Sequence, residues 1–273
     1  MGAVRQANAP LMLGAALLVA MLLLGIGFSA LFGLDPHMGH LGARLAPPDL
    51  AAGHPFGTDQ LGRDMLARTA AGVVWSITAA GCATLIALFI GTGLALVAAE
   101  LGGRVLVVVQ LLVNSVITLP GIVIAVIVTA VIGQGWLPIV VTLGIITWPV
   151  FARVILAEAL SLRARDYVAA ARLLGQSRLK TVLLHILPAL KPTLYVMAAF
   201  HFADMLIAEG ALSFLGLAAP LGEPTWGNMM ADSRPYVFSA PWMLLAPAGA
   251  IIAAVIAANL IGDGLSRAFS DGG

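Results

Sequence analysis

Three ionisable side chains interrupt an otherwise apolar stretch of the sequence, residues 192–217: His201, Asp204 and Glu209. Ionisable groups inside a hydrophobic segment are costly, so by default they face a water-filled cavity or a partner group. His201 and Asp204 are one helical turn apart, so they could contact a polar solute, a cation or a metal chelate, or bind each other as a buried pair. We predict that the three residues line a pathway for solute. Pairing within the protein and a position nearer an interface are the alternatives.

A second group of candidate ligands lies near the N-terminus. His37, His40 and His54 share one segment with Asp35 and Asp49, which suggests a metal site. Their spacing matches no standard metal-ligand pattern, and a solvated loop explains them more simply. We therefore predict no metal site in this chain.

Several classes of enzyme lack support because their motifs are missing. There is no G-x-x-x-x-G-K-[ST] phosphate loop, so any ATP must be hydrolysed by another protein. H-E-x-x-H and G-x-S-x-G motifs are also absent, and the charge pattern has no nucleic-acid footprint. The lone cysteine, Cys82, excludes an internal disulfide and is expected to pack inside an apolar run. We expect no covalent chemistry and no cofactor in the chain itself.

The composition predicts that a membrane surrounds these residues. Apolar residues make up 60% of the chain and charged residues only 10%, whereas about a quarter of the residues in a soluble domain are charged. Several uncharged runs exceed the roughly 20 residues that cross a bilayer as a helix. We predict an all-α integral membrane protein that forms a single domain over residues 1–273. Its six transmembrane helices are expected at about 9–34, 70–99, 105–132, 137–157, 192–217 and 242–261.

Two features define the first four spans. The first apolar stretch follows Arg5 as in a signal peptide, but its core at 11–34 is too long and lacks an A-x-A exit, so we expect it to be retained. The long run at 105–152 is interrupted at 133–138 by glycine and proline, which predicts a helical hairpin with a tight turn. Six spans leave both termini on one side of the membrane.

The basic residues predict which side that is, because Lys and Arg are retained in the cytoplasm. With the N-terminus inside, ten basic residues are cytoplasmic and four are outside, so we expect both termini in the cytoplasm. Seven of the fourteen lie between Arg153 and Lys191. The connection between the fourth and fifth spans is therefore the main cytoplasmic feature.

That connection, residues 158–190, has an ordered pattern that a loose basic loop would not need. Residues 166–174 favour a short helix, Gly175 can end it in the left-handed conformation, and Ser177 can cap a second helix that Pro188 stops. The second helix would carry an apolar stripe beside a basic face. The stripe consists of Leu179, Val182, Leu183 and Ile186.

Two alanines, a following glycine and a Leu-Pro pair make this connection resemble the EAA loop of ATP-binding-cassette importer permeases. In that family the short helix docks in a groove of the cytosolic ATPase and transmits its closure to the membrane helices. The family's usual Glu is replaced here by Ala169, so we expect altered rather than absent coupling. The candidate ATPase-coupling residues are Ala169, Ala170, Ala171, Gly175, Leu187 and Pro188.

A second motif, at residues 56–64, resembles the G-T-D-x-x-G-R-D signature of the peptide and nickel importer permeases. Segments 212–217, 224–230 and 259–263 agree with the same family, and the chain is most similar to the shorter of its two permease partners. From the residues alone, the motif could cap the next helix, or its charged residues could form an ion-paired outer lock. The candidate outer-motif residues are Gly57, Thr58, Asp59, Gly62, Arg63 and Asp64.

The segment at 218–240 is expected on the same outer side. It contains three prolines, and Trp226 and Trp242 are expected near the membrane surface, where amphipathic rings are favoured. We weigh two interpretations equally: the segment dips back toward the bilayer as part of an outer gate, or it is an ordinary interfacial loop.

The resemblance implies a type I importer permease in the bacterial inner membrane, surrounded by lipid. The implied partners are a second homologous permease, two ATP-binding subunits that hold ATP and Mg, and an extracytoplasmic solute-binding protein, with no nucleic acid. Peptides are the first choice of solute, and nickel or a metal chelate is the alternative within the family. An alternative of another class is a proton-coupled secondary transporter, although no internal repeat supports it.

Overall fold

The computed structural model describes residues 2–32 and 35–270, which are mostly helical. Within these residues, β-structure is limited to isolated bridges, so the all-α prediction is confirmed. Short 3₁₀ turns at Leu41–Ala43 and Arg234–Tyr236 and a π-helical turn at Val182–Ile186 accompany the α-helices. The helices are α1 (Gly2–Phe32), α2 (Met65–Leu101), α3 (Gly103–Thr118), α4 (Gly121–Ile132), α5 (Trp136–Arg163), α6 (Asp166–Leu173), α7 (Arg178–Thr181), α8 (Leu187–Phe214), α9 (Trp226–Ser233) and α10 (Trp242–Ser270).

Five helical stretches among the described residues are long and apolar enough to cross a membrane, and the bent pair α3 and α4 makes a sixth if it counts as one span. Several are longer than the bilayer requires, since 37 residues of α2 extend about 55 Å at 1.5 Å per residue, against a hydrocarbon core of about 30 Å. The helices therefore continue beyond the apolar runs from which the spans were predicted.

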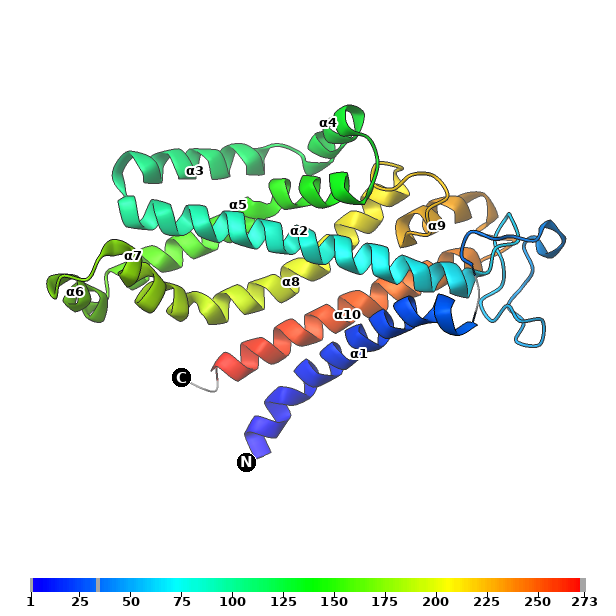
Figure 1. The fold of residues 1–273 in the computed structure, drawn as a ribbon, viewed down its shortest axis with the longest axis horizontal. Helices are drawn as coiled ribbons and strands as arrows, with labels where there is room; N and C mark the ends of the chain where they lie inside the picture. Colours follow the sequence, from blue (N-terminus) through cyan, green and yellow to red (C-terminus); the bar gives the residue numbers. More distant parts are fainter. Residues whose placement is uncertain (1, 33–34, 271–273) are drawn as a thin grey trace.

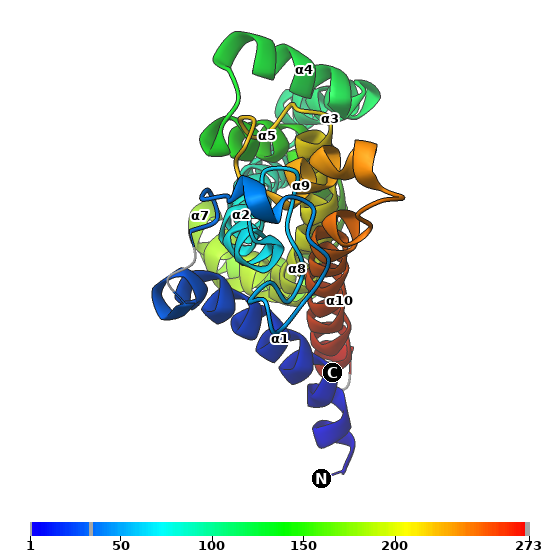
Figure 2. The ribbon, with the colours of Figure 1, turned by 90° about the vertical axis from the view of Figure 1, so that its right-hand side faces the viewer.

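The helices form one elongated bundle (Figure 1). α2, α5 and α8 run through its middle, α1 and α10 lie together along one side, and α3 and α4 lie on the other, as the end-on view also shows (Figure 2). The beginning of α1, the end of α10, α6 and α7 gather toward one end. The outer-motif segment 35–64 and α9 lie at the opposite end.

The predicted third span, 105–132, is not one continuous helix. It is divided into α3 and α4, which are bent by 87° from each other. The break falls at Leu119 and Pro120, because proline has no N–H to donate and forces the preceding residue out of the helical region. Leu119 accordingly adopts an extended conformation, with φ −81° and ψ 129°.

The prediction that Pro188 stops a helix is also wrong. The chain remains helical from Arg178 to Phe214, so the fifth membrane helix begins well before residue 192. Pro188 is the second residue of α8 and directly follows a π-helical turn at Val182–Ile186. Immediately before it, the N–H of Leu187 donates to the carbonyl of Val182, five residues back, and this π-helical turn shifts the hydrogen-bond register.

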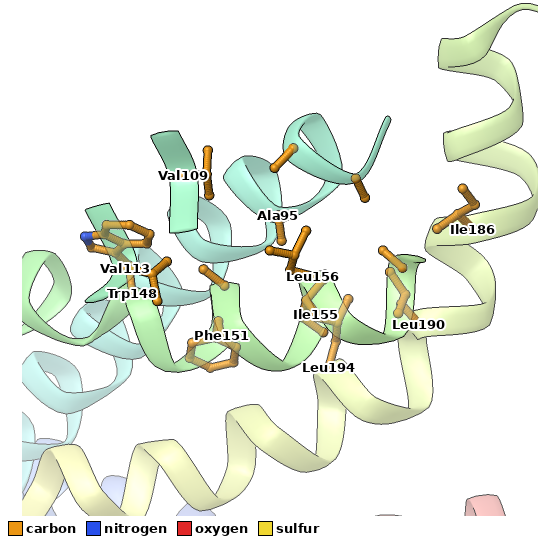
Figure 3. Packing of buried hydrophobic residues seen from close by; sticks show 14 of the residues in the cluster. Ala95, Val109, Val113, Trp148, Phe151, Ile155, Leu156, Ile186, Leu190 and Leu194 are labelled. Carbon is orange, nitrogen blue, oxygen red and sulfur yellow. The ribbon is translucent and has the colours of Figure 1, made fainter. Parts of the chain in front are cut away.

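The most extensive contact between two helices of the described chain is between α2 and α5. In the half of the bundle nearer α6, Phe151 and Ile155 of α5 are fully buried among residues of α2, α3 and α8 (Figure 3). Gly91 of α2 lies directly against α5, and a Cβ atom at this position would be 2.7 Å from the Cβ of Phe151. A glycine is therefore needed for the two backbones to approach.

We expect Gly91→Leu to destabilise the protein by about 1–3 kcal/mol, the usual cost of overpacking a well-packed interior. Gly93→Leu is the matched control, because no heavy atom lies within 4 Å of a Cβ built two residues further along the same helix. Thermal unfolding of the purified membrane complex would measure both variants. Equal unfolding temperatures for the two variants would contradict the close contact between α2 and α5.

Candidate functional site

The outer motif, residues 57–64, forms a compact turn over the start of α2. Gly57 and Gly62 have φ values of +71° and +72°, in the left-handed region that favours glycine. A Cβ at Gly57 would also be 2.8 Å from ring atoms of Trp242. Thr58 is fully buried, and its backbone carbonyl accepts a 3.0 Å hydrogen bond from the indole nitrogen of Trp242. The motif thereby joins the start of α2 to the start of α10.

Asp59 is the centre of a buried charge cluster at this end of the bundle. Its carboxylate lies 2.6 Å from Nε of Arg63 and 3.6 Å from Nε of Arg68, and all three residues are at most 6% exposed. It also accepts hydrogen bonds of 2.9 Å from the backbone N–H groups of Leu61 and Arg63. Two guanidinium groups thus share one carboxylate away from solvent.

Asp64 has a different part in the motif. It is the N-cap of α2, where it accepts a 2.8 Å hydrogen bond from the N–H of Ala67. Its other carboxylate oxygen lies 2.9 Å from Nδ1 of His54. Asp64 therefore caps α2, as one interpretation of the motif predicted. The ion pair within the chain is formed by Asp59 and Arg63.

Helix α9 connects the segment 218–240 to this cluster. Asp232 of α9 is 3.8 Å from Arg63 and 4.0 Å from Arg68. Trp226 is fully buried, and its indole nitrogen donates to the carbonyl of Thr69 at 3.0 Å. Its position near the membrane surface stays a prediction. The segment contains an element packed on α2, α8 and α10, and its gating role stays a prediction.

The coupling segment, residues 158–190, has the local geometry that its sequence predicts. α6 ends before Gly175, whose φ is +84°, and the Ser177 hydroxyl accepts the N–H of Lys180 at the start of α7. The apolar stripe of the second helix is divided, because Val182 and Ile186 are buried while Leu179 and Leu183 are exposed. Of the coupling candidates, Ala169, Ala170, Gly175 and Pro188 are exposed, and Ala171 and Leu187 are half-buried.

Two features of the coupling segment were missed by the sequence analysis. Leu173 and Leu174 are each 89% exposed at the tip beside Gly175, an unusual position for two neighbouring leucines. Arg172 of α6 forms a 2.6 Å ion pair with Glu100 at the end of α2, and Glu100 is only 8% exposed. Arg163 at the end of α5 donates to the carbonyl of Ala99 on α2. The only available signal for the ion pair was that Glu100 ends a long uncharged run.

The three candidate pathway residues do not share one surface. His201 is 6% exposed, and its ring packs edge-on against Phe151 with the ring centroids 4.9 Å apart. Asp204 is exposed on the surface of α8. Glu209 is fully buried and accepts a 2.7 Å hydrogen bond from the Ser213 hydroxyl. In the described part of the chain, His201 and Asp204 do not form an ion pair with each other within 4 Å.

No group of three or more His, Cys, Asp or Glu side chains is arranged to hold a metal ion among residues 2–32 and 35–270. The histidines of the outer segment are separated instead. His54 contacts Asp64, whereas His37 and His40 are exposed.

Comparison with known proteins identifies relatives over most of the chain. Residues 91–272 match the family described as binding-protein-dependent transport system inner membrane component. The dipeptide transport system permease protein DppC of Alkalihalophilus pseudofirmus is 33% identical over 218 residues, which cover 80% of this chain and 72% of that protein.

Two further relatives extend the match. The probable D,D-dipeptide transport system permease protein DdpC of Escherichia coli is 32% identical over 259 residues, 94% of this chain and 86% of its own length. The di/tripeptide transport system permease protein DppC of Pseudomonas aeruginosa is 33% identical over 228 residues, 82% of this chain and 75% of its own length. These similarities include both the outer end of the bundle and the coupling segment.

Proposed function

Because the chain belongs to the binding-protein-dependent transport system inner membrane components, we propose that it carries short peptides across the membrane as one half of a permease pair. It is a multi-pass inner-membrane permease subunit, and ATP is bound by partner ATPases rather than by this chain. The observation that carries the peptide assignment is that relatives along most of the chain are named for dipeptide and tripeptide transport. Nickel or a metal chelate is the alternative solute.

We propose that this chain works with three kinds of partner protein. A solute-binding protein delivers the peptide, a second homologous permease completes the pathway, and two ATP-binding subunits drive the cycle. The exposed Leu173 and Leu174 support docking of an ATPase at the tip of α6, since an apolar surface on a basic segment needs a partner to cover it.

The proposed orientation has both termini and the α6 end of the bundle in the cytoplasm. Six of the fourteen basic residues fall between Arg163 and Lys191, at the α6 end of the bundle, which supports this orientation by the positive-inside rule. The outer motif and α9 then face the solute-binding protein, and the buried ion pairs of Asp59 stabilise the outer closure.

The coupling proposal follows from how α6 is attached to the bundle. The Glu100–Arg172 ion pair fixes α6 to the end of α2, and α2 packs closely on α5 through Gly91. A movement of α6 on ATPase closure would therefore displace α2 and α5 together. The permease pair would alternate between inward-open and outward-open packings, with ATP shifting the equilibrium between them.

A test at Gly175 separates this function from its alternatives. We expect Gly175→Val to lower peptide-stimulated ATPase activity and uptake about 5- to 30-fold in the reconstituted transporter, because a left-handed valine costs about 1–2 kcal/mol. Gly53→Val is the control, since Gly53 also has a positive φ, +81°, and open space around it, but lies at the outer end.

Retention of the ATPase subunits during purification gives a second measurement for both variants. Normal uptake by Gly175→Val would contradict the coupling role. Uptake by the wild-type chain under a proton gradient without ATP would contradict the importer mechanism and favour a secondary transporter.

A further inference from the structure

A polar groove lies between α3 and α5 on the surface of the bundle, with a volume of about 410 Å³. Three polar side chains line it: Gln110 and Asn114 of α3 and Arg153 of α5. All three are exposed. Apolar residues of the two helices, including Val113 and Leu156, form its floor.

The groove continues along α3 as a polar stripe. Gln110, Asn114 and Thr118 follow one another at intervals of four residues, so they lie on one face of the helix, and each is exposed. The stripe rises about 12 Å along the helix axis. Val107 and Leu111 lie on the same side of the helix as these polar residues, whereas the exposed Val108 and Leu112 lie on a neighbouring apolar face.

These side chains lie away from the end of the bundle. Arg153 is ten residues before Arg163, which contacts the carbonyl of Ala99 at the end of α2, so it lies about 15 Å inside the bundle along α5. Gln110 is six residues beyond Arg104, about 9 Å from the start of α3.

Arg153 also lacks a counter-charge within the described part of the chain. Its guanidinium has no carboxylate within 4.0 Å among residues 2–32 and 35–270 whose side chains are placed. By contrast, Arg63, Arg68 and Arg172 each have such a partner. A guanidinium that faces an open polar groove and has no internal partner is available to an external anion.

We propose that Arg153, Gln110 and Asn114 form a carboxylate-binding subsite in the inner half of the translocation pathway, which holds the C-terminal carboxylate of a passing peptide. The proposal rests on the peptide function proposed above. The planar guanidinium can donate two parallel hydrogen bonds to a carboxylate, and the amide groups of Gln110 and Asn114 can donate others. Because the groove is open, the carboxylate stays partly hydrated and can leave again.

An anionic lipid headgroup has the same charge, but the stripe favours the solute. A headgroup would remain at one depth, near the inner surface, whereas the polar face of α3 continues outward to Thr118. A path for a peptide must offer polar contacts at successive depths. The apolar face with Val108 is the part of α3 suited to lipid tails.

The experiment uses single cysteines in the complete transporter in inside-out membrane vesicles. The chain contains one native cysteine, so Cys82→Ala gives a background for Asn114→Cys in the groove and for the control Val108→Cys on the apolar face. Anionic sulfonatoethyl and cationic trimethylammonium-ethyl methanethiosulfonate are compared as modifying reagents. We expect both to modify Asn114→Cys and neither to modify Val108→Cys.

The charge of the site is measured by adding Arg153→Gln to the Asn114→Cys background. We expect the ratio of anionic to cationic modification rates to fall about tenfold, and Arg153→Lys to restore most of it. A dipeptide with a free C-terminus should slow the anionic reagent at millimolar concentration. The corresponding dipeptide amide should not.

Three results would overturn the proposal. An unreactive Asn114→Cys would mean that lipid or another subunit covers the groove. An unchanged rate ratio in Arg153→Gln would mean that Arg153 does not set the charge of the groove. Protection that follows the anionic lipid content of the vesicles, and not the peptide, would assign the site to a headgroup. Loss of ATP-dependent peptide uptake by the wild type is a separate result, and it would contradict the proposed function.

Discussion

Asp59→Asn should lower the unfolding temperature of the assembled permease by on the order of 10 °C. The substitution keeps the shape of the side chain but removes the negative charge that Arg63 and Arg68 share. Removing one partner of a buried ion pair costs about 3–5 kcal/mol, because an uncompensated charge remains inside the protein. For a protein of this size, each kcal/mol corresponds to about 2–4 °C.

The cluster itself offers a control for this change. Asp232 contacts the same two arginines, but at 3.8 and 4.0 Å and with a side chain that is 30% exposed. Asp232→Asn should therefore cost no more than about 1 kcal/mol, as expected for an ion pair in contact with solvent. Equal shifts for the two variants would mean that burial of Asp59 does not determine the stability of the outer end. Thermal unfolding in detergent, monitored as the loss of folded complex, measures the stability of both variants.

The membrane helices could be predicted because the bilayer imposes one requirement on every span. A segment that crosses hydrocarbon must be apolar and must satisfy its backbone hydrogen bonds internally, so long uncharged runs predict helices. Helix shape could not be predicted from the same pattern. Pro120 breaks a span by 87°, whereas Pro188 lies within a continuous helix. An extended Leu119 precedes Pro120, whereas a π-helical turn precedes Pro188, and no residue marks that turn in the sequence.

The functional residues divide according to how far their contacts extend along the chain. Contacts within a few residues were predictable: the cap at Asp64, the pair of Asp59 with Arg63, and the left-handed Gly175. Contacts between distant segments were not, because nothing in the sequence indicates that Glu100 lies next to Arg172, 72 residues away.

The same limit applies to burial. Helical spacing placed His201 and Asp204 one turn apart. It could not indicate that His201 is buried and Asp204 is exposed. Their role in the pathway stays a prediction. The polar residues exposed on α3 and α5 were not selected as candidates at all, because Gln110 and Asn114 carry no charge and Arg153 was counted with the cytoplasmic basic residues.

Glu100→Gln should reduce the peptide transported per ATP hydrolysed by roughly tenfold or more. The ion pair of Glu100 with Arg172 is the charged contact that holds α6 on α2, and a hydrogen bond to a charged partner contributes about 1.5–3 kcal/mol. Without it, α6 can still bind an ATPase, but its movement is transmitted less completely to α2 and α5. ATP hydrolysis should persist while uptake falls, because the ATPase sites are in other subunits.

A double-mutant cycle distinguishes this pair from a general loss of stability. Arg172→Gln alone should have a similar effect, and the double variant should be no worse than either single one, because both changes remove the same interaction. Arg178→Gln is the control, since Arg178 is 72% exposed and lies 4.0 Å from Glu100. Additive losses in the double variant would show that the two residues act independently. In that case the movement of α6 must reach the membrane helices through another contact.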